Sequence, residues 1–517
     1  MNTALTDTLD VVIDVGALSF QDVVDVARRD AKVRVSERSL EAMATSRSVI
    51  DGLAADSRPH YGVSTGFGAL ASKQIPVELR AQLQRSLIRS HAAGTGPEVE
   101  REVIRALMLL RLSTLATGRT GVRPLVAETY AAVLNAGITP VVGEYGSLGC
   151  SGDLAPLAHC ALALIGEGDV RDADGILMPA GDALAAAGIA PLELHEKEGL
   201  ALINGTDGML GMLVLAITDL RALITTADLA AAMSVEGLLG TDAVFADDLQ
   251  GLRPHPGQRD SAANMRNALI GSPMLARPAG FTRVQDAYSL RCAPQVHGAV
   301  RDTIDHAATV ASRELASAVD NPVVTEDGRI ESNGNFHGAP VAYVLDFLAI
   351  AAADLASMSE RRTDRFLDVS RNHGLNAFLA DDPGVDSGHM IAQYTQAGIV
   401  SELKRLAVPA SVDSIPSSAM QEDHVSMGWA AARKLRRVVD GVSRVVAIEL
   451  LTAARAMDMR APAVPGVVTG AVVARMRTTI DGPGTDRYLA PEIARAHAMV
   501  IDGSLLDAAR TAGGELV

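Results

Sequence analysis

Apolar residues near the N-terminus recur at the spacing of one helix face. In a shorter stretch before them, apolar and polar residues alternate instead. Leu40, Met43 and Ile50 lie on one such stripe, which is typical of an amphipathic helix. Residues 10–15 (DVVIDV) alternate as a strand does, and residues 19–22 (SFQD) resemble a capping box at the start of a helix. The helices expected in this mixed part of the chain cover residues 19–29, 36–53, 77–92 and 98–116.

Beyond residue 199 the pattern changes to long, proline-poor segments rich in Ala and Leu. These segments cover residues 207–239, 295–319, 340–367 and 426–460. The last two are roughly 30 residues long, which exceeds the average globular helix. We therefore predict a mainly α fold, a bundle of long antiparallel helices with a smaller mixed N-terminal part. The expected domains are residues 1–198 and residues 199–517, and the continuous apolar patterning indicates bundles that pack between subunits.

Composition supports close helix packing and excludes several function classes. Hydrophobic residues make up 48% of the chain and aromatic residues only 3%, so small aliphatic side chains must fill the core. The net charge of -16 and the pI near 5.2 disfavour nucleic acids and anionic membranes as partners. The richest apolar run, residues 199–218, is interrupted by Asn204 and Asp207, so we expect no membrane span.

The cysteines and the start of the chain favour a reducing compartment. Cys150, Cys160 and Cys292 are too few for a disulfide framework and lack the spacing of zinc ligands, so no metal site is expected. Residues 1–14 carry acids and no basic n-region, and no signal peptide is therefore visible. The simplest location is the cytoplasm.

Familiar cofactor motifs are absent, and one loop rich in glycine and serine remains. The chain has no Gly-x-Gly-x-x-Gly after a strand, no P-loop and no His-Glu-x-x-His, which removes dinucleotide, phosphate-loop and zincin interpretations. Residues 146–159 read GSLGCSGDLAPLAH. On structural grounds alone this is a glycine loop that ends in an N-cap at Asp153, with Pro156 in the first helical turns.

The same loop also permits a backbone cyclisation at Cys150-Ser151-Gly152. If the nitrogen of Gly152 attacks the carbonyl carbon of Cys150, loss of that carbonyl oxygen and of the Ser151 hydroxyl as two waters leaves an exocyclic methylene. Gly152 offers no side chain to hinder the attack, and the flanking glycines tolerate a strained backbone. The product is a 4-methylidene-imidazol-5-one, a soft electrophile made without a diffusible cofactor.

This segment resembles the signature of the aromatic amino acid ammonia-lyase family, and in particular of its branch that acts on histidine. Two positions depart from the family pattern: Cys150 stands where Ala is more common, and Ser64 stands where Asn is common. Neither blocks the cyclisation, because the first ring residue contributes its backbone. Further similar blocks are YGVSTGFG from Tyr61, RSHAAGTG from Arg89, EGLALINGT from Glu198, LRPHPGQ from Leu252, QDAYSLRCAPQVHG from Gln285, DNP from Asp320, SNGNFHG from Ser332, SSAMQEDHVSMG from Ser417 and YLAPEI from Tyr488.

The resemblance implies catalytic tyrosines and a carboxylate-binding arginine. Tyr61 matches the catalytic tyrosine of the family, and Tyr288 matches a second tyrosine close to the electrophile. Ionising an unperturbed phenol at pH 7 costs roughly 4 kcal/mol, so nearby groups must lower its pKa, and Arg291 and His91 are the candidates. Arg291 would bind the substrate carboxylate through a bidentate pair. Gln285, Tyr288 and Arg291 are three positions apart, so they would lie on one side of a helix if this segment is helical.

Substrate choice is expected to depend on His91 and Glu422. A buried imidazole brings two nitrogens that need partners, whereas a phenyl ring needs apolar walls, so these two residues favour histidine. Asn204 resembles the family residue that hydrogen-bonds the ring or the substrate carboxylate, and its structural alternative is a turn before glycine. Phe336 is expected to form a wall of the pocket, although a core aromatic would fit its turn as well.

The leading hypothesis is thus elimination of ammonia from L-histidine to give trans-urocanate. The resemblance also implies a homotetramer whose subunits share active sites. A tyrosine or phenylalanine ammonia-lyase, or an aminomutase of the same family, is the alternative. A hydrolase with Ser151 or Cys150 as nucleophile lacks the Gly-x-Ser-x-Gly spacing. An inactive helical assembly protein would have no use for the intact Cys150-Ser151-Gly152 triad.

Overall fold

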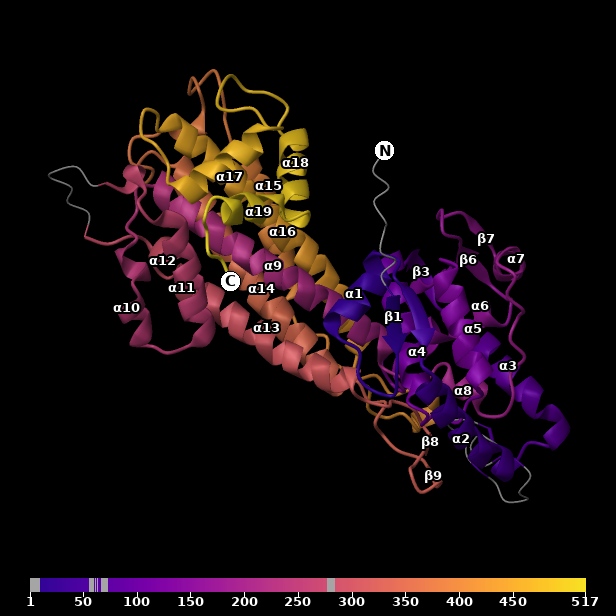
Figure 1. The fold of residues 1–517 in the computed structure, drawn as a ribbon. Coiled ribbons are helices and arrows are strands. Elements are labelled where there is room, and N and C mark those ends of the chain that lie inside the picture. The colour runs from indigo at the N-terminus through magenta and orange to yellow at the C-terminus, as the bar shows by residue number, and fades with distance from the viewer. Residues whose placement is uncertain (1–9, 55–59, 61, 63, 67–72, 277–283) are drawn as a thin grey trace, which may run out of the picture. The chain divides into compact units, whose positions relative to one another are not determined.

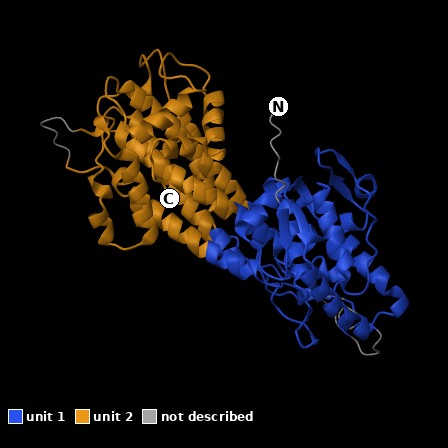
Figure 2. Cartoon of the chain, viewed as in Figure 1, with its two compact units in different colours: residues 1–215, 308–346, 409–433 blue, residues 216–307, 347–408, 434–517 orange. Residues whose placement is uncertain are grey.

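The computed structural model describes residues 10–54, 60, 62, 64–66, 73–276 and 284–517. Within these residues helices dominate and the strands are short, which confirms the expected mainly α fold (Figure 1). The chain forms two compact units (Figure 2). Unit 1 comprises residues 1–215, 308–346 and 409–433, and unit 2 comprises residues 216–307, 347–408 and 434–517.

The start of unit 1 follows the local sequence signals. β1 (Asp10–Ile13) pairs in parallel with β2 (Lys32–Val35), and α1 (Phe20–Arg28) connects them. The expected capping box is present: the Ser19 backbone N–H donates to the Asp22 carboxylate at 2.8 Å, and the Asp22 backbone N–H donates to the Ser19 hydroxyl at 3.1 Å. Helix α2 (Glu37–Ala54) matches its prediction within a residue.

A buried helix forms the core of unit 1. α4 (Arg101–Ala116) is buried along all but its first residues, and it packs against α1 and α5 (Pro124–Asn135). The expected helix over residues 98–116 was too long at its start, because Glu98 ends β3 (Thr95–Glu98), which pairs with β5 (Gly143–Tyr145). The expected helix at 77–92 begins as a 3-10 turn, Val77–Leu79, and continues as α3 (Arg80–His91).

Short elements complete the described part of unit 1. They are β4 (Thr139–Pro140), α6 (Leu154–Leu164), β6 (Asp169–Arg171), β7 (Leu177–Pro179), α7 (Ala180–Ala186), α8 (Glu198–Ala201), β8 (Val323–Val324) and β9 (Ile330–Glu331). Strands β4, β6 and β7 form one antiparallel sheet, and β8 pairs with β9.

The four long segments expected from the sequence are all helices. They are α9 (Asp207–Gly237), α13 (Ala293–Leu315), α14 (Ala339–Leu367) and α16 (Gly428–Met459). Each contributes residues to both units, and the expected boundary between residues 198 and 199 stays a prediction. The shorter helices of unit 2 are α10 (Asp247–Gly251), α11 (Pro256–Leu269), α12 (Tyr288–Arg291), α15 (Met390–Leu406), α17 (Val467–Arg477), α18 (Ala490–Ile501) and α19 (Ser504–Thr511).

Two of the long helices have the length and apolar composition of a membrane span. In α9 and α14 the most apolar window of 18 residues has a mean hydropathy of 1.6 and 1.7. Those windows are 78% and 61% buried inside the protein, as is usual for helices in the core of a bundle. Burial among neighbouring helices therefore accounts for their composition.

Candidate active site

The loop that carries Cys150-Ser151-Gly152 lies between β5 and α6, and Gly205 fixes its conformation. Gly149 and Gly152 have φ angles of 66° and 80°, in the left-handed region that side chains disfavour. Gly152 forms a parallel bridge with Gly205, and the Asp153 amide donates to the Gly205 carbonyl at 2.7 Å. A β-carbon on Gly152 would lie 2.0 Å from that carbonyl oxygen, so both φ and space require glycine there.

A second segment holds the other side of the loop. The Ser426 hydroxyl donates to the Gly149 carbonyl at 3.1 Å, and the Met427 amide donates to the Leu148 carbonyl at 3.0 Å. Ser426 is buried and only four positions after Glu422. The loop is thus attached to the segment that carries one of the expected specificity residues, a connection that no sequence signal indicated.

Asp153 precedes α6 as expected, but its side chain has a different role. The carboxylate accepts the Ser147 hydroxyl at 3.0 Å and the Met209 amide at 2.8 Å, and it makes no capping hydrogen bond to its own helix. Complete burial raises the pKa of Asp153 to about 7. Asp153 therefore stands at the expected N-cap position, but its side chain does not cap α6, because the carboxylate accepts from Met209 at the start of α9 instead. Pro156 lies in the first turn of α6, as predicted.

Glu422 lies within electrostatic reach of both His91 and Cys150. Its carboxylate accepts the Ser417 hydroxyl at 2.9 Å, and the backbones of Ser417 and Glu422 form an antiparallel bridge. Burial lowers the pKa of His91, and the negative charge of Glu422 opposes that shift. Burial and the same carboxylate raise the pKa of the Cys150 thiol to about 12. The structure thus brings together His91, Glu422 and the first residue of the loop.

The hydrogen bonds of His91 fix the tautomer of its neutral ring. His91 ends α3, and its Nδ1 lies 2.9 Å from the Leu87 carbonyl oxygen. A carbonyl oxygen can only accept, so Nδ1 carries the hydrogen. In the neutral ring Nε2 is consequently an acceptor, suited to an N–H group of a ligand.

Asn204 is buried beside the loop, and one of its polar side-chain atoms has no partner among the described residues. Its amide nitrogen donates to the Asn321 carbonyl at 3.1 Å, whereas Oδ1 has no hydrogen-bond partner among the described residues. The fully buried Arg111 donates to the carbonyl of Asn204 at 2.7 Å and thereby fixes its backbone. Arg111 was not anticipated from the sequence, and the binding role of Asn204 stays a prediction.

Phe336 lies in the loop between β9 and α14 and is half-buried. The next residue, His337, stacks on His424 with ring centroids 5.4 Å apart, and a ring nitrogen of each lies 3.3 Å from the other. His424 follows Glu422 by two positions. The Phe336 loop and the Glu422 segment are therefore joined, although a wall role for Phe336 stays a prediction.

Unit 2 carries three further expected site residues, namely Gln285, Tyr288 and Arg291. Tyr288 and Arg291 open and close the single turn of α12, and the Arg291 guanidinium carbon lies 4.6 Å from the centre of the Tyr288 ring, a cation–π contact. Arg291 Nε is buried with no hydrogen-bond partner in the described part of the chain. Gln285 precedes the helix in an irregular segment, so the expectation that all three share one helix side holds only for Tyr288 and Arg291.

Tyr61 lies outside the described residues, and its role stays a prediction. Nearby, the fully buried Ser64 hydroxyl accepts the His60 amide at 2.9 Å. This contact gives Ser64 a local function at a position where the family more often has Asn.

Comparison with known proteins identifies the family of the chain. The family model of aromatic amino acid lyases matches residues 18–478. A histidine ammonia-lyase of Streptomyces griseus is 65% identical over 98% of this chain and 99% of its own length. The solved histidine ammonia-lyase of Trypanosoma cruzi is 36% identical with a TM-score of 0.90, covering 98% of this chain and 96% of that one. Tyrosine aminomutase of Streptomyces globisporus is 38% identical with a TM-score of 0.92, covering 97% and 99%. The chain belongs to the aromatic amino acid lyase family.

Proposed function

We propose that this chain is a histidine ammonia-lyase, which eliminates ammonia from L-histidine to give trans-urocanate. The observation that supports the proposal is that the Glu422 carboxylate lies within electrostatic reach of both His91 and Cys150. These two polar groups suit the two nitrogens of an imidazole and would be costly against a phenyl ring. The 65% identical histidine ammonia-lyase of Streptomyces griseus supports the same substrate.

The electrophile is proposed to form from Cys150, Ser151 and Gly152. The Gly152 nitrogen bonds to the Cys150 carbonyl carbon. Two waters are lost, one containing the oxygen of that carbonyl and the other the oxygen of the Ser151 hydroxyl. The residues fit this group, because the left-handed glycines and the Gly205 carbonyl hold the loop where a β-carbon on Gly152 has no room. The resulting 4-methylidene-imidazol-5-one supplies an electron-poor alkene that takes the substrate amine and improves it as a leaving group.

Other side chains of the chain bind the substrate and move its β-proton. His91 Nε2 and the Glu422 carboxylate accept the two N–H groups of the substrate imidazole in its protonated form. Arg291 pairs with the substrate carboxylate, and Asn204 Oδ1 adds a hydrogen-bond acceptor. Tyr61 is the proposed base and Tyr288 the second phenol of the site, with Gln285 and Phe336 completing the binding surface.

A second candidate is a lyase or aminomutase acting on tyrosine or phenylalanine. The likeness to tyrosine aminomutase, with a TM-score of 0.92, favours considering it. An aminomutase returns ammonia to the β-carbon, so its product is a β-amino acid rather than an acrylate. Products formed from each of the three amino acids separate these activities.

We also propose a cytoplasmic homotetramer in which subunits share active sites. The exposed aromatic and aliphatic side chains on α14, namely Tyr343, Phe347 and Ile350, support burial against another copy of this chain. Native mass measurement of the purified protein tests the stoichiometry.

The central experiment is the intact mass of the purified chain, measured together with urocanate absorbance. The active protein should be lighter than its translated sequence by two waters. Ser151→Ala should remove this deficit and nearly all activity, whereas Ser418→Ala, at an exposed position, should change neither. A fully active Ser151→Ala variant would contradict the proposal, as would an active wild-type chain of unchanged mass.

A further inference from the structure

Unit 2 contains a fully buried ion pair that joins two of its helices, and a hydroxyl from a third helix donates to the same carboxylate. Arg362 of α14 and Glu449 of α16 are both inaccessible to solvent. Their side chains pair through two contacts, Nε to Oε1 at 2.5 Å and Nη2 to Oε2 at 2.9 Å. Ser234 of α9 donates its hydroxyl to the same carboxylate at 2.7 Å. The Arg362 guanidinium is thereby fixed in its plane.

The remaining arm of Arg362 holds the backbone of α12. Its Nη1 donates to the carbonyl oxygen of Ser289 at 3.2 Å, and Ser289 is the second residue of the single turn Tyr288–Arg291. A turn of four residues has too few internal hydrogen bonds to be stable alone, and its last carbonyls have no helical partners. Arg362 satisfies one of these carbonyls from the core, between the two residues that the proposed function assigns to the substrate.

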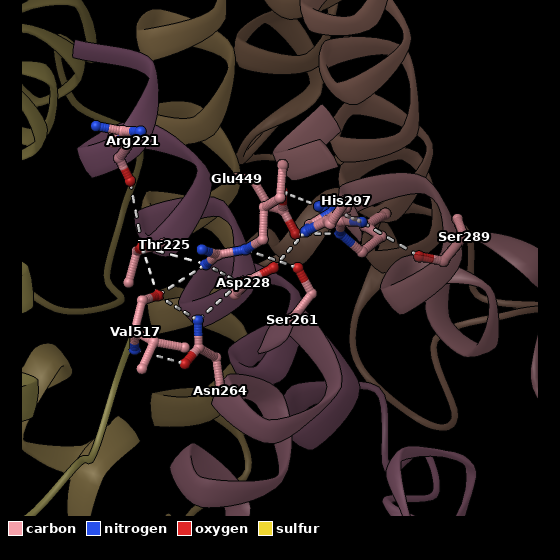
Figure 3. Close-up of polar contacts among 11 residues, drawn as sticks. Arg221, Thr225, Asp228, Ser261, Asn264, Ser289, His297, Glu449 and Val517 are labelled. Carbon is pink, nitrogen blue, oxygen red and sulfur yellow. Dashed lines mark hydrogen bonds and ion pairs between the residues drawn. The ribbon is translucent and has the colours of Figure 1, made fainter. Parts of the chain in front are cut away.

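His297 contacts the same guanidinium, and Asp228 in turn binds His297, as Figure 3 shows for these last two residues. His297 Nε2 lies 3.5 Å from Arg362 Nη1, and His297 Nδ1 lies 2.8 Å from Asp228 Oδ1. Because a guanidinium can only donate, Nε2 accepts and Nδ1–H donates to Asp228, so the ring is neutral. Arg301 and Asn264 donate to the other Asp228 oxygen at 2.7 Å and 2.9 Å.

We propose that Arg362 is a positioning residue, which fixes α12 so that Tyr288 and Arg291 are presented to the substrate in one geometry. The effect on catalysis that we infer rests on the proposed function. Tyr288 is 69% exposed, and it contacts Arg291 within the same helical turn. The positions of both side chains therefore depend on the position of the α12 backbone. A displacement of about 1 Å at such a site lowers the rate by about a hundredfold.

Stability alone does not explain the pair. A buried ion pair is usually no more stabilising than apolar side chains of similar volume, because both charges lose their hydration. The third contact, from Arg362 to Ser289, is the one that an apolar pair cannot replace. Positioning and stability can therefore be separated by removing both charges together.

The test compares Arg362→Met/Glu449→Gln with the wild-type chain. The double variant leaves no unpaired charge and keeps an acceptor for Ser234, but it releases the Ser289 carbonyl. We expect the mass deficit of two waters to persist, KM for histidine to rise about tenfold, and kcat/KM to fall by ten- to a hundredfold. Partial unfolding lowers the apparent kcat through loss of active protein and leaves KM unchanged, so the rise in KM is specific to positioning.

Amide hydrogen exchange of residues 288–292, measured without substrate, tests the same proposal independently of activity. We expect these amides to exchange at least tenfold faster in the double variant. A wild-type chain without activity on histidine would refute the proposed function, whereas unchanged exchange in the double variant would refute the positioning role alone.

Arg460→Met is the matched control. Arg460 donates to the carbonyls of Gly237, Asn372 and His373 and to none in α12, so its loss should lower the melting temperature and leave KM and the exchange of residues 288–292 unchanged. If the double variant does not fold, KM and the exchange of residues 288–292 are measured on Arg362→Lys instead. Lys keeps the charge but cannot bind Glu449 and Ser289 together. Wild-type KM and exchange in whichever variant folds would overturn the proposal.

Discussion

Gly152 and Gly205 face each other so closely that a β-carbon on Gly152 would lie 2.0 Å from the Gly205 carbonyl oxygen. Real β-carbons do not approach backbone atoms this closely, and the φ of 80° at Gly152 adds strain for any residue with a side chain. We predict that Gly152→Ala abolishes the two-water mass deficit and reduces ammonia-lyase activity by at least about a thousandfold, as expected when the catalytic electrophile is missing. Intact mass and urocanate formation measure both effects.

Gly188→Ala provides the control for backbone strain. Gly188 has a φ of 69° but nothing within 4 Å of an added β-carbon. Its substitution should cost about 1 to 2 kcal/mol of stability and leave mass and activity unchanged. A Gly152→Ala chain that carries the deficit would show that contact with Gly205 does not control ring formation.

The buried carboxyl of Asp153 should make stability depend on pH. Burial raises its pKa from the usual 3.8 to about 7, so the folded chain binds the proton more tightly than the unfolded chain. The resulting stabilisation is complete below about pH 4 and is lost as the pH rises through 7. The comparison uses two chains, Ser151→Ala with Asp153 intact and Ser151→Ala with Asp153→Asn, because Ser151→Ala keeps the peptide open. Between about pH 4 and pH 7 the free energy of unfolding of the first should fall, relative to the second, by on the order of 4 kcal/mol.

Thermal unfolding at several pH values measures this difference. The contacts from Ser147 and Met209 are shared by every pH point, so only protonation changes the comparison. A difference between the two chains that is constant from pH 4 to 7 would contradict a raised pKa at Asp153. An opposite slope would mean that Asp153 is ionised in the folded chain.

Ser417 should tune substrate binding through Glu422. Its hydroxyl donates to the Glu422 carboxylate at 2.9 Å and limits the rotation of that side chain. We predict that Ser417→Ala raises KM for histidine about fivefold, the effect of losing about 1 kcal/mol of hydrogen bonding to a charged group. The mass deficit should stay intact. Steady-state kinetics measure the change, and the exposed neighbour Ser418→Ala should leave KM at the wild-type value.

Local signals in the sequence predicted most of the elements. The capping box of Ser19 and Asp22 depends on residues three positions apart, and the long helices follow from continuous apolar patterning within each segment. Such features need no knowledge of the rest of the chain. The predicted start of a helix at residue 98 was wrong because Glu98 pairs with a strand more than forty positions later, and this tertiary contact overrides local propensity.

The proposed chemistry of the loop follows from Cys150-Ser151-Gly152, whereas the contacts that hold the loop could not be predicted from the sequence. Ser426 holds Gly149 across 277 positions of sequence, and Asp153 holds Met209 across 56. Neither contact leaves a periodic pattern or a spacing rule. The same is true of Arg362, whose effect on α12 depends on the packing of α14. Sequence reasoning proposed the residues that react and gave no sign of the residues that hold the loop and α12.

Cys150 should be an unreactive thiol despite its place in the loop. Burial and the nearby Glu422 carboxylate raise its pKa to about 12, and the thiolate is the form that attacks alkylating reagents. At pH 8 we predict that iodoacetamide modifies Cys150 at least about a hundredfold more slowly than a free cysteine of pKa 8.5. The Ser151→Ala chain is the substrate for this measurement, because its peptide stays open, and peptide masses report the modified site.

Glu422→Gln in the same Ser151→Ala background isolates the carboxylate's contribution. Removing the negative charge lowers the pKa of the Cys150 thiol, so alkylation should accelerate while burial still keeps it below the rate of a free cysteine. Equal rates in the two chains would mean that the Glu422 charge does not reach the loop. The substrate specificity proposed for Glu422 depends on that same proximity, so this measurement tests the arrangement of the site without requiring turnover.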